Sequence, residues 1–245
     1  MSEQSATIPT HLGFILDGNR RWAKRHNLPT YEGHLAGYNA LKDVILHAAD
    51  RGIKFVSVYV FSTENWKRSQ EEVSGLMSLA LRIFKSDIKE IIDKQIRVRI
   101  LGAREAIPEK VLTAMEETEE KSKDFTRTTV AFCFNYGGQR EITDAVQRCI
   151  DDGLKNVTEA DIRERLYEAD IPDVDMVVRT SGEQRISNFM LWNLAYTELY
   201  FTDVLWPDFN ESEFDKALTY YAERERRFGC TSEQLRSEHL CLNSA

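Results

Sequence analysis

Short apolar runs alternate with amphipathic segments along the chain, and this alternation constrains the fold more than any other feature. The apolar runs are rich in β-branched and aromatic residues, as in the stretch from Phe55 to Phe61, which is typical of buried strands. Strands that alternate with helices pair in parallel, because each helix carries the chain back across the sheet. We therefore predict a single α/β domain with a central, mainly parallel six-stranded sheet flanked by helices. The predicted strands are 12–16, 55–61, 96–101, 128–134, 174–178 and 199–201.

The segments between these strands show the periodicity of helices that have one apolar face. The clearest case is 71–94, where Leu76, Leu79 and Ile83 belong to one broad apolar stripe. The predicted helices are 20–26, 35–50, 71–94, 108–121, 141–151, 158–168, 188–195 and 211–226.

Composition limits the partners and the compartment. The chain has 245 residues and a formal net charge of -8, whereas a general nucleic-acid binder needs excess Lys and Arg, so we expect no nucleic-acid partner. Four cysteines without C-x-x-C spacing predict reduced thiols in a cytoplasmic protein. The polar stretch from Met1 to Thr10 does not resemble a signal peptide, and no apolar run approaches the ~18 residues of a membrane span. Peripheral contact with a membrane stays open.

Polar segments follow four of the predicted strands. Ligands of parallel α/β sheets bind outside the carboxyl ends of the strands. Each segment alone is consistent with an ordinary polar loop, but four of them at one edge of a sheet predict a functional site. The segments are 17–22, 62–68, 135–140 and 179–188.

The chemistry of these segments points to phosphorylated substrates. Gly18 and Asn19 open a helix directly after a strand, where free N–H groups and the following arginines suit a phosphate. Asp17 beside a phosphate suggests a bridging Mg²⁺, although a simple helix cap is the alternative. Arg179, Arg185 and Ser187 suit a second anion, or else the arginines form surface ion pairs with Glu183 and its neighbours. Neither G-x-x-x-x-G-K-[ST] nor G-x-G-x-x-G occurs, so nucleotide binding of the usual kinds is not supported.

Longer motifs carry a specific resemblance. The motifs are H-L-G-F-I-L-D-G-N-R-R-W-A (11–23), F-S-T-E-N-W-K-R (61–68), N-Y-G-G-Q-R-E-I (135–142), R-T-S-G-E-Q-R-I-S-N-F (179–189) and L-W-N-L-A-Y-T-E-L-Y-F-T-D-V-L-W-P-D-F (191–209). Together they closely resemble the cis-prenyltransferases, the undecaprenyl diphosphate synthase family of isoprenyl transferases. The resemblance covers about 9–229, which leaves 1–8 and 230–245 as tails.

The resemblance implies a fold, a reaction and partners. It implies a homodimer of α/β subunits, each with a hydrophobic tunnel that holds the growing product. It implies Mg²⁺-dependent condensation of isopentenyl diphosphate with an allylic diphosphate, which gives a Z-polyprenyl diphosphate. The residues do not decide between a short product and one of undecaprenyl length; the doubled arginine Arg20-Arg21 occurs in some short-chain members, and an undecaprenyl-type lipid carrier is favoured because it is the commoner product. Arginines, helix N–H groups and Mg²⁺ would stabilise the leaving diphosphate, so this chemistry needs no activated Ser or Cys nucleophile.

The resemblance also assigns roles by position. Asp17 resembles the aspartate that works with Mg²⁺, Asn65 resembles the proposed proton acceptor, and Glu198 resembles the second metal ligand. The positions that match substrate-binding residues are Gly18, Asn19, Arg20, Arg21, Trp22, Thr30, His34, Ser62, Thr63, Glu64, Trp66, Arg68, Arg179, Arg185, Ile186 and Ser187. By itself, a lone histidine such as His34 is as consistent with a structural role as with a functional one.

One departure from the family pattern concerns the allylic site. Many members carry arginine where Thr30 stands, four residues before His34. The site here is therefore predicted to be less basic, unless Lys24 or Arg25 compensates.

Seven apolar residues are candidates for the wall of the predicted tunnel. The same residues would also suit an ordinary core. They are Leu76, Leu79, Ala80, Ile83, Val60, Phe132 and Phe134.

The alternatives to a cis-prenyltransferase are a non-catalytic accessory subunit of the same fold and a Mg²⁺-dependent phosphatase that acts on organic diphosphates.

Overall fold

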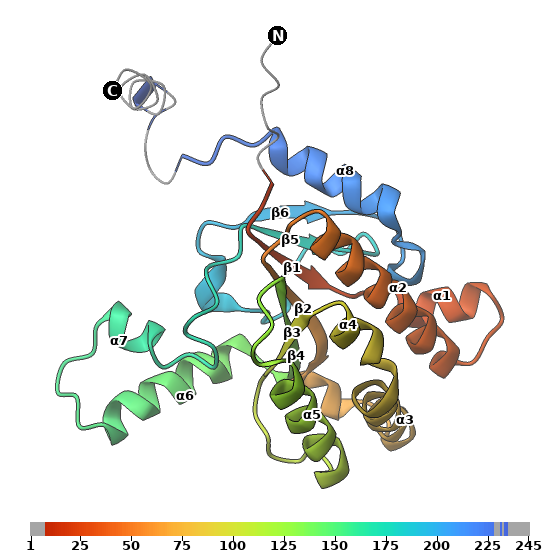
Figure 1. Cartoon of the computed structure of the whole chain (residues 1–245), viewed down its shortest axis with the longest axis horizontal. Helices are drawn as coiled ribbons and strands as arrows, with labels where there is room; N and C mark the ends of the chain where they lie inside the picture. The colour runs from red at the N-terminus through yellow and green to blue at the C-terminus, as the bar shows by residue number, and fades with distance from the viewer. Residues whose placement is uncertain (1–7, 228–230, 232, 235–245) are drawn as a thin grey trace.

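A parallel sheet forms the centre of the molecule. The computed structural model describes residues 8–227, 231, 233 and 234, so most of the two predicted tails lies outside the described residues. Within the described part, six strands pair in parallel in the order β3-β4-β2-β1-β5-β6 (Figure 1). This confirms the predicted sheet. The strands are β1 (His11–Ile15), β2 (Phe55–Ser62), β3 (Ile96–Leu101), β4 (Thr128–Tyr136), β5 (Met176–Arg179) and β6 (Glu198–Phe201).

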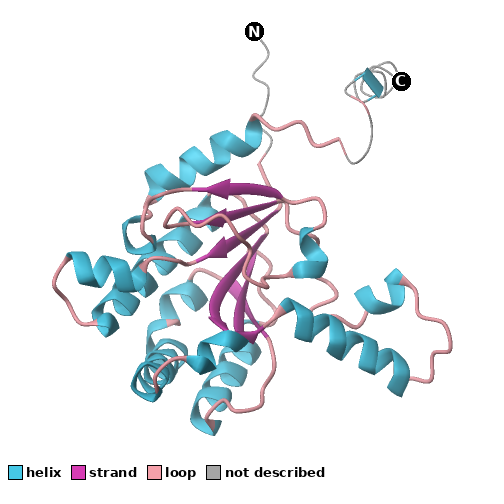
Figure 2. Ribbon diagram, turned by 180° about the vertical axis from the view of Figure 1, so that it is seen from behind, coloured by secondary structure: helices cyan, strands magenta, loops and turns pink. Residues whose placement is uncertain are grey.

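Helices cover both faces of this sheet (Figure 2). The α-helices are α1 (Asn19–Arg25), α2 (Thr30–Asp50), α3 (Gln70–Arg82), α4 (Lys89–Asp93), α5 (Glu109–Ser122), α6 (Gly138–Asp151), α7 (Glu159–Arg163) and α8 (Glu211–Ala222). The shorter elements are 3-10 turns η1 (Thr63–Lys67), η3 (Leu191–Leu194) and η4 (Trp206–Asp208), and a π-helical turn η2 (Ile83–Asp87).

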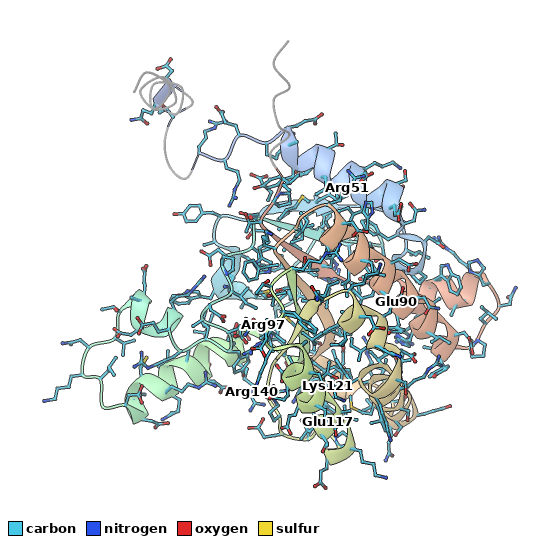
Figure 3. All side chains as sticks on the ribbon, viewed as in Figure 1. Arg51, Glu90, Arg97, Glu117, Lys121 and Arg140 are labelled. Carbon is cyan, nitrogen blue, oxygen red and sulfur yellow. The ribbon has the colours of Figure 1, made fainter. Side chains whose placement is uncertain are left out.

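Alternate strand residues feed two separate cores, because successive side chains of a strand point to opposite faces. Phe14, Val58 and Phe132 join the larger core with α2, α3, α5 and α8. Their neighbours Tyr59 and Cys133 join the smaller core, next to the segments around Val174 and Phe189. Both faces are therefore buried, as all-parallel sheets require. Charged side chains lie outside these layers, as Glu117 and Lys121 do on α5 (Figure 3).

The predicted helix 71–94 is not one continuous helix. It consists of α3, the π-helical turn η2 and α4. In η2 the amide of Ile88 donates to the carbonyl of Ile83 at 2.9 Å, and the hydroxyl of Thr118 donates to the carbonyl of Phe84 at 3.1 Å. A single inserted residue scarcely changes an apolar stripe, so periodicity alone does not reveal a π turn.

Other predicted helix bounds were also wrong. The segment 188–195 forms only η3, because Asn188 and Met190 have positive φ angles of 65° and 39° that an α-helix excludes. The helices predicted at 158–168 and 211–226 end earlier, at Arg163 and Ala222. In contrast, α2 begins at Thr30, five residues before the predicted start.

A bulge lies where β2 approaches the functional edge. The register of β2 against β4 shifts on either side of Phe61. Bulges re-aim side chains and are common beside active sites. Here consecutive residues from Tyr59 to Ser62 all line one cavity, which a regular strand would not allow.

Candidate active site

The site begins where β1 and β5 end side by side. Ile15 pairs with Arg179 in the sheet register, so Asp17 lies next to the end of β5. The Asp17 carboxylate accepts a hydrogen bond from Arg179 at 2.9 Å and lies 3.4 Å from the Arg21 guanidinium. The hydroxyl of Thr180 donates to the carbonyl of Asp17 at 2.6 Å and accepts from its amide at 3.1 Å. This places one carboxylate between two arginines at the carboxyl edge of the sheet.

The electrostatics of this cluster keep Asp17 ionised. Burial by itself would raise the pKa of the carboxyl. The hydrogen bond and charge of Arg179, together with the charge of Arg21, outweigh burial and lower the pKa below its usual value. Asp17 therefore carries a full negative charge at neutral pH.

Arg179 is the most buried cation of the site, with 3% of its surface exposed. Its Nη1 donates to the hydroxyl of Ser187 at 2.8 Å and to the carbonyl of Arg185. The guanidinium is thus held on several sides in a fixed orientation, which suits recognition of a phosphate group.

Arg185 and Ile186 take less direct positions than the sequence predicted. The Arg185 guanidinium is 58% exposed and pairs with Glu183, as in the ion-pair alternative, while its carbonyl supports Arg179. Ile186 packs against the smaller core. Of this predicted anion site, the structure brings Arg179 and Ser187 together.

The start of α1 sits tightly on α2. A Cβ at Gly33 would lie 2.2 Å from the Asn19 carbonyl oxygen, and one at Gly37 would lie 2.4 Å from the Asn19 side-chain oxygen. Only glycine allows this approach, which fixes the loop from Asp17 to Arg20 over the site. Trp22 belongs to the same helix, but its indole donates to Asp208 at 2.7 Å.

Glu72 organises a second group of predicted residues, although the sequence analysis did not select it. Its carboxylate lies 2.9 Å from Arg68, 3.8 Å from Arg20 and 3.6 Å from the His34 ring, and it is 13% exposed. Burial and the charges of Arg68 and Arg20 outweigh the effect of Glu72 and lower the pKa of His34. His34 is therefore neutral at pH 7. The available signal was the cap spacing Ser69-x-x-Glu72 at the start of α3.

The turn η1 presents Asn65 to the site. The amide of Ser62 donates to the Asn65 side chain at 3.0 Å, in a capping box that closes the turn. The indole of Trp66 donates to Asn135 at 2.7 Å, and Asn135 is itself held by the carbonyl of Ala103 at 2.9 Å. Asn135 belongs to a segment that the sequence singled out, but we did not predict it as a site residue.

Glu64 lies on the outer side of the same turn. Burial would raise the pKa of its carboxyl, but hydrogen bonds from its own amide and from Asn188, Ser62 and Thr63 lower it below the usual value. Glu64 is therefore a fixed negative charge beside the turn. Asn188 was likewise not predicted as a site residue.

Two adjoining hollows meet at Asp17, which lines both of them. The first is a cavity of about 270 Å³ with Asp17, Asn65, Arg179 and Ser187 among its polar lining. Its remaining wall is largely apolar and includes every candidate wall residue: Val60, Leu76, Leu79, Ala80, Ile83, Phe132 and Phe134. The second is an open cleft of about 760 Å³ lined by Asp17, Gly18, Asn19, Arg20, Arg21, Lys24, Thr30, His34 and Arg68, among others. Lys24 thus accompanies Thr30 in this cleft.

Glu198 does not join the cluster within one chain. It opens β6 opposite Met176, whereas Phe201 is the residue opposite Arg179. Three residues of a strand span about 10 Å. Glu198 therefore lies near the amino ends of the strands, whereas Asp17 lies at their carboxyl ends. Among the described residues, no group of three His, Cys, Asp or Glu side chains is arranged to hold a metal ion.

A parallel α/β fold in which an arginine-rich cluster opens on an apolar cavity suits ligands that combine an anionic head with an apolar chain. Residues 15–229 match the family model described as putative undecaprenyl diphosphate synthase, and the chain belongs to this family of isoprenyl transferases. This confirms the predicted family and the transferase class.

Named relatives agree with this assignment. The chain is 49% identical over 222 residues to the isoprenyl transferase of Fusobacterium nucleatum, covering 91% of this chain and 96% of the relative. It is 40% identical over 237 residues to the ditrans,polycis-undecaprenyl-diphosphate synthase ((2E,6E)-farnesyl-diphosphate specific) of Vibrio vulnificus, covering 94% of each. Among solved structures, lavandulyl diphosphate synthase from Lavandula x intermedia in complex with dimethylallyl diphosphate superposes with a TM-score of 0.87 at 34% identity. That match covers 91% of this chain and 98% of the plant chain.

Proposed function

We propose that this chain is a cis-prenyltransferase that condenses isopentenyl diphosphate with an allylic diphosphate to give a Z-polyprenyl diphosphate of the undecaprenyl type. The observation that carries the proposal is the junction of Asp17 and Arg179 with the apolar cavity. Such a junction suits a substrate with a diphosphate head and a hydrocarbon tail. The Vibrio vulnificus relative is named as a farnesyl-diphosphate-specific undecaprenyl-diphosphate synthase, which supports the product and the allylic primer class.

The two hollows suggest how the substrates divide between them. The open cleft, with Arg20, Arg21 and Arg68, supplies cations for the allylic diphosphate. Arg179 and Ser187 would hold the diphosphate of isopentenyl diphosphate. The allylic hydrocarbon would then extend into the apolar cavity, which the cleft adjoins through Asp17, Asn19, His34 and Arg68.

These residues suit the bond changes of the reaction. The bond between the allylic carbon and its diphosphate oxygen breaks, and the arginines stabilise the negative charge that develops on the leaving diphosphate. The double bond of isopentenyl diphosphate attacks the allylic carbon and forms the new carbon–carbon bond, which requires the two substrates to be held close and aligned. A proton then passes from the carbon next to the resulting cation to a weak base such as the released diphosphate, which restores a double bond. Asn65, the proposed proton acceptor, lines the cavity where the reacting carbons would meet.

Mg²⁺ is the cofactor that this proposal requires, and the donor chemistry of Asp17 fits it. The carboxyl is ionised because its pKa is lowered, and Mg²⁺ commonly uses one or two carboxylates with phosphate oxygens as its other ligands. A bound Mg²⁺ supplies neutralisation of diphosphate charge. Asp17 would hold the ion. Glu198, the other predicted metal ligand, lies outside the Asp17 cluster and is not needed to hold the ion there.

Several further expectations belong to the same proposal: a 9–229 catalytic domain, a homodimer, a cytoplasmic location and peripheral contact with a membrane. Leu28 supports membrane contact, because it is 42% exposed and lines the open cleft together with the cationic Lys24. Exposed apolar and cationic residues together suit an anionic membrane surface. Within the described residues, no helix has the length and apolar character to cross a membrane.

One incubation tests the proposed function and both alternatives. The protein is mixed with Mg²⁺, isopentenyl diphosphate and either geranyl or farnesyl diphosphate, and the products are sized by chromatography. Chains longer than the primer by multiples of five carbons support the proposal. Release of phosphate without elongation would indicate the phosphatase, and absence of any turnover would indicate an accessory subunit.

A further inference from the structure

Asn188 connects three segments of the site. Its side-chain oxygen accepts a hydrogen bond from the amide of Gln139 at 2.8 Å, and its carbonyl accepts from the amide of Gly138 at 2.7 Å. Its side-chain nitrogen donates to the Glu64 carboxylate at 3.0 Å. One residue therefore joins the loop after β5 to the start of α6 and to the turn η1.

The chemistry of the partners fixes the orientation of this amide. A backbone N–H can only donate and an ionised carboxylate can only accept, so the Asn188 oxygen must face Gln139 and its nitrogen must face Glu64. Exchange of the two ends would break both hydrogen bonds. Asparagine is thus the side chain that satisfies both neighbours at once.

The backbone at this point is held in an uncommon conformation. Ser187 and Asn188 have consecutive φ angles of 49° and 65°. Left-handed residues of this kind cost free energy and persist where their surroundings fix them. The hydrogen bonds of Asn188 provide that fixation, and they set the place of the Ser187 hydroxyl that supports Arg179 at 2.8 Å.

Asn188 therefore stands between the two groups that the reaction must align. On one side is the anion site of Arg179 and Ser187, and on the other is η1, which carries Glu64 and Asn65. Asn135 holds the same turn from its other side through Trp66.

We propose that Asn188 is a positioning residue, which sets the distance between the Arg179 anion site and the turn that carries Asn65. The inference rests on the proposed function, because it concerns the alignment of isopentenyl diphosphate with the reacting carbons. A mutation remote from the reacting atoms that misplaces a substrate by about 1 Å can cost on the order of 100-fold in rate. Since Arg179 extends from β5 itself, its guanidinium still offers its charge to a diphosphate when Asn188 is changed, whereas the alignment of Ser187 and η1 is lost, so the loss appears mainly in kcat.

The substitution Asn188→Asp tests this role. It keeps an oxygen for the Gln139 amide but places a second carboxylate against Glu64. We expect kcat to fall by roughly tenfold to 100-fold, while the KM for isopentenyl diphosphate, whose diphosphate Arg179 and Ser187 would hold, stays within about threefold of the native value. A kcat within about threefold of the native value would overturn the proposal, as would a loss that appears in KM while kcat is unchanged.

Asn210→Asp is the matched control. Asn210 likewise accepts a backbone N–H at the start of a helix, from Ser212 at 3.0 Å in α8, but it lies outside both hollows of the site. The same change of amide to carboxylate is made there, and kcat should be unaffected.

A double substitution tests the contact itself. Adding Glu64→Gln to Asn188→Asp restores one donor and one acceptor with the direction of the hydrogen bond reversed. Asn188→Asp should therefore lower kcat less in the Glu64→Gln background than in the native background, and equal factors would contradict the inference. Urea unfolding of the native chain, the two single variants and the double variant measures the coupling between Asn188 and Glu64 without turnover. A failure of prenyl transfer by the native chain would therefore refute the proposed function without refuting this contact.

Discussion

Ala80 offers a direct test of the apolar cavity as the place where the hydrocarbon chain grows. Its side chain is buried on α3 and lines the cavity opposite residues of β2 and β4. Phenylalanine at this position would project six additional carbons into the space. A fully enclosed site that accepts benzene has a volume of about 150 Å³, which corresponds to roughly 25 Å³ for each carbon.

The arithmetic gives a large effect. By that scale the cavity of about 270 Å³ holds roughly ten carbons, and Ala80→Phe removes about 150 Å³, or more than half of the space. The six carbons lost exceed one five-carbon unit. A product of undecaprenyl length needs several times this volume, so such a chain would extend beyond this cavity. We therefore expect Ala80→Phe to shorten the longest product by at least one five-carbon unit.

The assay compares product lengths from the native and substituted proteins with the same primer. Ser78→Leu is the control, because Ser78 is exposed on the same helix and does not line the cavity. Overpacking costs about 1–3 kcal/mol, so thermal unfolding is measured to show that Ala80→Phe is folded. An unchanged product distribution from a folded Ala80→Phe protein would refute the assignment of this cavity to the growing chain.

Three other predictions concern charged residues. Asp17→Asn should lower the rate of condensation by at least about 100-fold without unfolding the protein, because the charge that faces Mg²⁺ and the arginines is lost; steady-state kinetics and circular dichroism check this. Glu72→Gln should lower the pKa of His34 further, because the Glu72 charge raises it; a ring-proton NMR titration measures the change, and an unaltered titration would contradict the contact. Burial raises the pKa of Glu168 to about 7, with a hydrogen bond to Asp170 adding to the effect. Since the folded state prefers the protonated form, stability should fall as pH rises through 7, and Glu168→Gln should remove that dependence in urea unfolding at pH 6 and pH 8.

Much of the site could be located from the sequence because one rule connects strand order to ligand position. The carboxyl ends of β1, β2, β4 and β5 were predicted from apolar runs, and the polar segments after them do meet at one edge. Asp17, Arg179 and Ser187 lie together there. The apolar lining of the cavity was equally predictable, since its residues fall on one stripe that runs from α3 into η2 and on strands β2 and β4.

The contacts among the polar residues could not be predicted in this way. Glu72 meets His34 only because α2 and α3 pack side by side, and their separation in sequence gives no sign of it. Arg185 and Trp22 turn toward Glu183 and Asp208, although neighbours in sequence enter the site. A motif specifies which residues are present, while side-chain direction depends on the local backbone and on partners from distant segments.

The sequence by itself determined the α/β class, the parallel sheet, the family and the edge where the chemistry gathers. These follow from periodicity and from motif order, which are local properties of the chain. The tertiary structure alone decided that η2 interrupts the long helix, that Glu198 lies away from Asp17, and that Asn188 links three loops. The place of Glu198 depends on strand register, the links of Asn188 depend on a positive φ angle, and Thr118 of α5 contacts η2 from far along the chain. Contacts distant in sequence hold all three, so local periodicity does not reveal them.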